Sequence, residues 1–136
     1  MRGAGYWLGD GLAVATGTFE GQPVAVTGSR DTTLRLWHLG RRELLLRPLT
    51  GHTAPVEAVT IAQLNGETKV ISGSRDGTLR IWDLRTALST VIPLDSPVTA
   101  LATASSGRVL AGTDQGILAL DVQPGSAQAA HVPGAL

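Results

Sequence analysis

Apolar and polar positions alternate with a period of two along most of the chain, which is typical of half-buried β-strands. The pattern is clearest in 68–74 and 78–84, TKVISGS and TLRIWDL, which flank the turn signal Arg75-Asp76-Gly77. Such a pair predicts a β-hairpin. The stretch 56–62, VEAVTIA, predicts a further strand ahead of it, closed by a turn at 65–66. No helical pattern competes with these strands.

The same hairpin pattern occurs more than once. Residues 27–39, TGSRDTTLRLWHL, match residues 72–84, SGSRDGTLRIWDL, at a constant offset of 45 (73 − 28 = 45). An eroded third copy, LAGTDQGILALDV, covers 110–122, where Gly112 follows Gly73 by 39 (112 − 73 = 39). Repeats of ~40–45 residues are expected of four-stranded propeller blades. The chain is therefore predicted to be all-β, with three four-stranded antiparallel units at about 12–50, 51–96 and 97–136 after a lead-in at 1–11.

Composition excludes several classes of function. Eleven basic and eleven acidic residues cancel, so nothing in the charge favours a nucleic acid or an anionic membrane surface as partner. The absence of cysteine removes disulfides, thiol catalysis and Cys-based zinc sites. No apolar run approaches the ~18 residues of a membrane span. We expect a cytoplasmic protein without a membrane or nucleic-acid partner.

The second unit resembles a WD40 repeat. It carries in order a Gly-His pair, a strand serine, a turn aspartate and a Trp-Asp pair, at Gly51, His52, Ser72, Asp76, Trp82 and Asp83. The resemblance implies a partial β-propeller in which His52, Ser72, Asp76 and Trp82 form a buried hydrogen-bonded tetrad. An aspartate buried alone would be costly, so a donor such as His52 has to reach it. Ser72 would then connect the imidazole to the Trp82 indole.

The first unit keeps only part of this pattern. Thr27, Asp31 and Trp37 stand at the serine, aspartate and tryptophan positions, but Trp7 replaces the histidine and His38 replaces the aspartate after the tryptophan. We expect its network to be incomplete.

The third unit has lost the pattern. The constant offset places Ala111, Gln115 and Asp121 at the serine, aspartate and tryptophan positions, and no Gly-His pair precedes them. This unit is expected to be the least stable.

Ser72, His52 and Asp76 also invite comparison with a Ser-His-Asp hydrolase. The serine alternates inward on a strand, however, and no nucleophile-elbow sequence surrounds it. The remaining histidines, His38 and His131, lie in other units, so no spacing unites them as metal ligands. The GSRD segments do not open a helix as a phosphate loop does. We therefore predict no catalytic site, no metal and no cofactor.

Arg30, Arg75 and Glu57 are the candidate partner-binding residues. The two arginines immediately precede the turn aspartates, and by the resemblance they project from the face through which WD40 proteins usually engage partners. Arginine is over-represented in interaction hot spots, although a solvated turn arginine is the alternative. Glu57 lies on the same face. Arg35 and Arg80 recur as well, and their strand position favours a solvated face or an ion pair between blades.

Three blades are too few for a closed propeller, which has about four to eight. Two open flanks would expose apolar faces and unpaired backbone groups. Three outcomes remain open: part of a longer propeller, a homodimer that completes a six-bladed ring, or a chain that folds poorly. The predicted function is a non-catalytic scaffold that binds a protein or peptide. The alternative is a sensory or autoinhibitory propeller piece of a larger signalling regulator, an ATPase or kinase.

Overall fold

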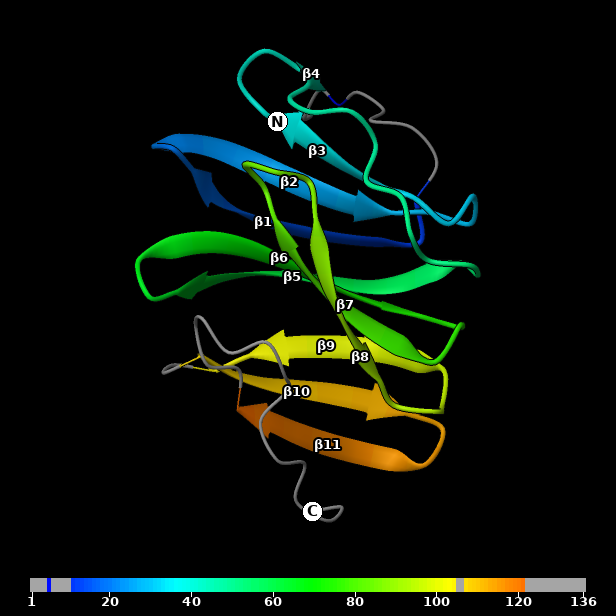
Figure 1. The fold of residues 1–136 in the computed structure, drawn as a ribbon. Coiled ribbons are helices and arrows are strands. Elements are labelled where there is room, and N and C mark those ends of the chain that lie inside the picture. The colour runs from blue at the N-terminus through cyan, green and yellow to red at the C-terminus, as the bar shows by residue number, and fades with distance from the viewer. Residues whose placement is uncertain (1–4, 6–10, 105–106, 122–136) are drawn as a thin grey trace.

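The structure, a computed structural model, describes residues 5, 11–104 and 107–121. These residues form three antiparallel sheets and contain no α-helix, which confirms the predicted all-β fold (Figure 1). The first sheet comprises β1 (Ala13–Phe19), β2 (Gln22–Gly28), β3 (Leu34–His38) and β4 (Glu43–Leu44). The second comprises β5 (Val56–Leu64), β6 (Glu67–Ser74), β7 (Thr78–Asp83) and β8 (Ser89–Pro93). The third comprises β9 (Val98–Thr103), β10 (Arg108–Thr113) and β11 (Gly116–Asp121), and in all three each strand pairs with the next along the chain.

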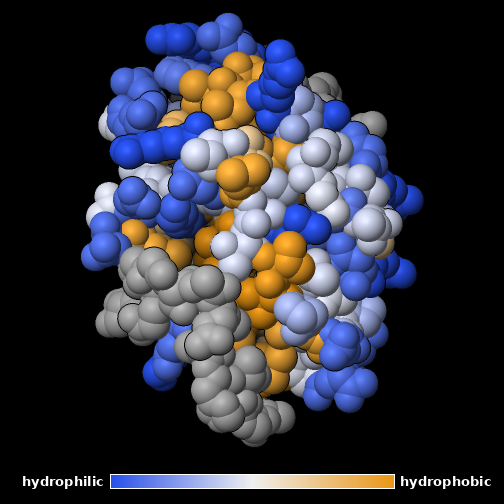
Figure 2. Space-filling model, viewed as in Figure 1, coloured by the Kyte–Doolittle hydropathy of each residue, from blue (hydrophilic) through white to orange (hydrophobic). Residues whose placement is uncertain are grey.

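The sheets follow one another in space as they do in the sequence, with β1 beside β5 and β5 beside β9. Two hydrophobic cores lie between them. The alternation of strand residues explains the division, because Val70 and Trp82 pack in the core with the first sheet while Ile71 and Leu79 pack in the core with the third. The second sheet is therefore buried on both faces. On the face shown in Figure 2, hydrophilic residues lie around patches of apolar side chains.

The glycine of each Gly-Ser-Arg-Asp copy marks a close approach between sheets. A Cβ atom on Gly28 would lie 2.6 Å from Cγ1 of Val56, and one on Gly73 would collide with Val98. Both valines stand at the beginning of the first strand of the following sheet. The repeated glycine thus lets neighbouring sheets pack at this end.

Two expected strands differ from the prediction. The fourth strand of the first unit is short, because Leu45 and Leu46 pack against the first core and pairing resumes only at the bridge between Leu34 and Leu49. The third sheet has three strands in the part of the chain that the structure describes. A fourth would fall in residues 122–136, which lie outside that part, as does most of the lead-in with Trp7.

The third hairpin has a shorter turn than the second. In the second sheet Gly73 pairs with Leu79, whereas in the third the corresponding Gly112 pairs with Ile117 (79 − 73 = 6; 117 − 112 = 5). The residue at the tryptophan position is consequently Leu120 rather than the residue after it. The constant offset used for this unit was wrong at this position.

Asp121 instead takes the place that Asp83 holds in the second sheet. It forms an ion pair with Arg108, with Oδ1 2.6 Å from Nε, as Asp83 pairs with Lys69 at 3.5 Å between Oδ2 and Nζ. The side chain of Leu120 is fully buried. The shorter turn keeps the carboxylate in solvent, where its charge costs no desolvation.

The outer faces of the first and third sheets carry exposed apolar side chains. Val14 and Ile117 are 66% and 55% exposed, and the pairing of Leu44 with Trp37 places another on the first of these faces. No sheet of the described residues packs there. Whether a second copy or further blades cover these faces stays a prediction.

Candidate functional site

Four side chains connect the loop before β5 to the hairpin of β6 and β7. Nδ1 of His52 lies 2.9 Å from Oδ2 of Asp76, and its Nε2 lies 2.7 Å from Oγ of Ser72. The indole N–H of Trp82 donates to the same Oγ at 2.9 Å. His52, Ser72 and Trp82 are buried in the described structure. A continuous hydrogen-bonded chain therefore runs from the turn carboxylate to the core.

The donors and acceptors of this chain allow one arrangement that satisfies every group. Because the indole can only donate, Oγ of Ser72 accepts from it and donates its own hydrogen to Nε2 of His52. Nδ1–H then donates to Asp76. Burial lowers the pKa of His52 and outweighs the opposing effect of the Asp76 carboxylate. The imidazole is thus neutral in the folded protein at neutral pH.

Asp76 anchors the loop as well as the imidazole. Its carboxylate accepts the backbone N–H of Thr53 at 3.0 Å and the hydroxyl of Thr78 at 2.6 Å. Burial alone would raise the pKa of Asp76, but the hydrogen bonds from Thr78 and His52 outweigh it and lower the pKa to about 2. The ionised carboxylate holds the loop against the turn.

The contacts among Ser72, His52 and Asp76 have the connectivity of a hydrolytic triad. Two observations separate them from one. The Ser72 side chain is fully buried at 0% exposure, so no substrate carbonyl reaches it. Its oxygen also already accepts the Trp82 N–H. This arrangement stabilises the sheet and does not present a nucleophile.

In the first sheet the corresponding residues do not join into one hydrogen-bonded chain. The indole N–H of Trp37 donates to Oγ1 of Thr27 at 3.1 Å. Asp31 instead accepts from Thr33 and from Arg35, its side chain is half exposed, and the Thr33 hydroxyl is the main cause of lowering its pKa to about 2. The histidine position, Trp7, lies outside the described residues.

Arg80 has a role that the sequence reasoning missed. Its guanidinium donates to the Gly51 carbonyl at 3.0 Å and to Oγ of Ser89 at 2.8 Å, and it lies 5.9 Å from the centroid of the Trp82 ring. A Cβ atom on Gly51 would meet Nη1 of Arg80 at 2.6 Å. The expectation of a solvated face or an ion pair between blades was therefore wrong for Arg80. Its recurrence in two repeats was the available signal.

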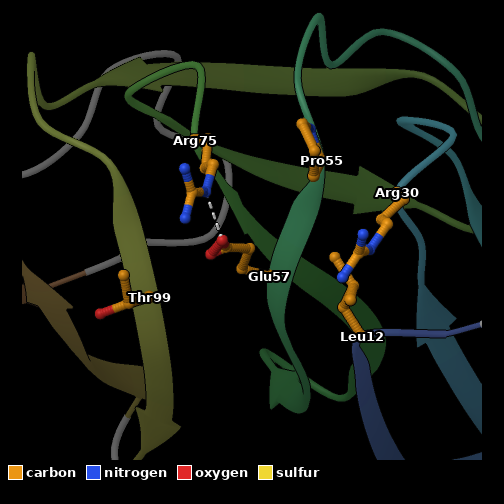
Figure 3. Close-up of a pocket in the computed structure, with 6 residues that line it drawn as sticks. All are labelled: Leu12, Arg30, Pro55, Glu57, Arg75 and Thr99. Atoms are coloured by element: carbon orange, nitrogen blue, oxygen red, sulfur yellow. Dashed lines mark hydrogen bonds and ion pairs between the residues drawn. The ribbon is translucent and has the colours of Figure 1, made fainter.

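The predicted partner-binding residues come together at one end of the sheets, around a cleft of about 610 Å³ (Figure 3). The lining residues are Leu12, Arg30, Pro55, Glu57, Arg75 and Thr99. Leu12, Glu57 and Thr99 stand at equivalent places, each directly before the residue that pairs with the hairpin glycine of its own sheet. Each of the three repeats thus contributes to the cleft one side chain at, or directly before, the start of its first strand.

The two cleft arginines differ in their partners. Nε of Arg75 lies 2.6 Å from Oε1 of Glu57, and this contact raises the pKa of Arg75. Arg30 is exposed and makes no hydrogen bond or ion pair with a described residue. Figure 3 shows its guanidinium extending toward Leu12, as that of Arg75 extends toward Glu57. The difference follows from the residue beneath each turn, which is Glu57 in the second repeat and Leu12 in the first.

We expect Arg75→Ala to leave the free energy of unfolding nearly unchanged. The Arg75 side chain is 65% exposed, and exposed ion pairs contribute little to stability. Urea unfolding at neutral pH checks this. A loss of several kcal/mol would show that the side chain packs inside the fold, and the assignment of this face as a surface would then be wrong.

Within residues 11–104 and 107–121, no three His, Cys, Asp or Glu side chains gather as a metal site requires. The same residues contain no helix with the length and apolar character needed to cross a membrane.

Residues 43–83 match the family model of the WD domain, G-beta repeat. The matched segment contains the loop with His52 and the hairpin with Ser72, Asp76 and Trp82. A comparison with curated proteins found no match.

Proposed function

Because the chain carries a WD40 repeat within a partial propeller, and domains of this kind serve as protein-interaction scaffolds, we propose that it is a non-catalytic scaffold whose cleft binds a protein or peptide. One observation carries the proposal: Leu12, Glu57 and Thr99, one residue from each repeat, converge beneath the turn arginines. A partner seated there contacts all three repeats.

The chemistry of the cleft suits a peptide segment. Leu12 is 40% exposed and Pro55 lines the same space, so apolar surface lies beside charged groups. The Arg75 guanidinium is held by Glu57 before any partner arrives, and such preorganisation reduces the entropy that binding costs. A volume of about 610 Å³ is within the range of binding pockets and accommodates a few side chains.

The test uses the absence of cysteine. In Thr99→Cys, the single thiol would carry an environment-sensitive dye inside the cleft. In Leu88→Cys, the dye would sit on an exposed residue of the turn between β7 and β8, at the opposite end of the second sheet. We expect peptides selected from a random displayed library against the unlabelled chain to change the fluorescence of the first variant and leave the second unchanged.

Selected peptides that alter only the dye at position 88, or a selection that enriches no peptide, would contradict a binding role for this cleft. The Thr99 side chain is exposed, and among the described residues it makes only a long hydrogen bond of 3.4 Å to the Gly112 carbonyl. The substitution is therefore expected to leave the fold intact, and circular dichroism checks this before labelling.

A further inference from the structure

The two halves of the cleft are a matched pair within one chain. Arg30 and Arg75 are equivalent at the offset of 45, and so are Leu12 and Glu57 (75 − 30 = 45; 57 − 12 = 45). In the second repeat the arginine holds a carboxylate from its own sheet, with 2.6 Å between Nε and Oε1. In the first repeat a leucine stands where that carboxylate would be. Among the described residues, the first arginine therefore has no carboxylate partner of this kind.

We propose that Arg30 binds the carboxylate of an aspartate or glutamate side chain in a partner peptide, and that an apolar residue beside it packs on Leu12 and Pro55. The inference deepens the proposed function and rests on it. The Glu57 carboxylate shows within the same molecule how a turn arginine at this position takes an acidic group (Figure 3). A charge-assisted bond of this type is stronger than a neutral hydrogen bond.

The surroundings of Arg30 favour a charged ligand over a neutral one. The guanidinium is exposed, while the neighbouring Leu12 offers apolar surface. A peptide that covers Leu12 excludes water from the guanidinium and lowers the local dielectric, which strengthens the attraction to a carboxylate. Apolar and ionic contacts therefore reinforce each other at this half of the cleft.

The charges nearby also favour a single carboxylate over a phosphate group. Arg75 is occupied by Glu57, and the negative charge of Asp114 acts on Arg75 from the third sheet. Among the described residues, the two arginines and the two carboxylates near the cleft leave no net positive charge, which provides little attraction for a group of charge near −2. An acidic side chain of a peptide is the ligand that this balance accepts.

The decisive pair of variants is Leu12→Glu and Leu12→Gln. Leu12→Glu supplies Arg30 with an internal carboxylate, as Glu57 does for Arg75, and so competes with the ligand. Leu12→Gln changes the shape and apolar surface in nearly the same way but brings no charge. Since Leu12 lies on the rim at 40% exposure, neither change disturbs a core, and urea unfolding verifies that both variants are folded.

The probes are the peptides enriched from the random displayed library on the unmodified chain, each synthesised with its acidic residue and with the matching amide. We expect an Asp or Glu next to an aliphatic residue to recur among them. Replacing that acid by its amide is expected to weaken binding about tenfold or more. Leu12→Glu is expected to weaken binding of the acidic peptide at least tenfold more than Leu12→Gln does. Fluorescence anisotropy measures the affinities that enter these comparisons.

Different results separate this inference from the proposed function. One result is that peptides alter the dye at position 99 but bind equally as acid and amide, or bind equally to Leu12→Glu and Leu12→Gln. Either form of this result would overturn the acidic ligand and leave the cleft as a binding site. Peptides that do not alter that dye would overturn both. Replacing the acidic residue of each enriched peptide by phosphoserine gives the third comparison: much tighter binding of the phosphopeptide would assign the site to phosphate instead and likewise overturn the inference.

Discussion

Trp82→Ala is expected to lower the free energy of unfolding by about 3–5 kcal/mol, as truncation of a buried aromatic side chain does. The Trp82 side chain is 1% exposed and packs between the first and second sheets. Its indole N–H also donates a hydrogen bond to Oγ of Ser72. Since total stability of domains is about 5–15 kcal/mol, this loss is a large fraction of it. Urea unfolding followed by far-ultraviolet circular dichroism measures the loss.

Trp37→Ala is the matched control. Trp37 occupies the equivalent place one repeat earlier, but its side chain is only half-buried, on the outer face of the first sheet. We expect it to cost less than half as much as Trp82→Ala, because less surface and fewer contacts are lost. Equal losses would contradict the assignment of the two faces. If Trp82→Ala fails to fold, Trp82→Phe provides the comparison, since it keeps most of the volume and loses the N–H donor.

Acidification is expected to reduce stability in two stages. The pKa of His52 is below its ordinary value of 6.5 in the folded protein, so the unfolded chain takes up that proton first. The stability from the neutral imidazole is complete above pH 6.5 and is lost as the pH falls toward the folded pKa. The pKa of Asp76 is about 2 when folded, against 3.8. Its contribution, on the order of 2 kcal/mol, is complete above pH 3.8 and is lost toward pH 2.

Asp76→Asn tests the second stage, because it removes the titrating group and should flatten the stability profile between the unfolded pKa of 3.8 and the folded pKa of about 2. Asp31→Asn is its counterpart in the first repeat. The pKa of Asp31 is also about 2, but its side chain is 50% exposed and solvent screens its interactions. We expect Asp31→Asn to flatten the profile less. Equal profiles for the two variants would contradict the role of Asp76 as the anchor of the loop.

Much of the second sheet could be predicted without coordinates. Strand alternation and the turn residues are local properties, and they placed the hairpin of β6 and β7 where the structure has it. The repeat at an offset of 45 transferred that hairpin to β2 and β3. The resemblance to a WD40 repeat then named His52, Ser72, Asp76 and Trp82 as one set, and the structure joins them by hydrogen bonds.

The sequence by itself determined the kind of structural unit and the number of units, because a period of two, a turn and a repeat length are all patterns along the chain. Only the tertiary structure decided that Leu120 and not Asp121 faces the core, since one turn residue shifts the register of the whole hairpin. Only the tertiary structure showed that Arg75 pairs with Glu57 while Arg30 makes no ion pair with a described residue, because that depends on which residue lies beneath each turn. These outcomes depend on contacts between segments far apart in the chain, which no local pattern records.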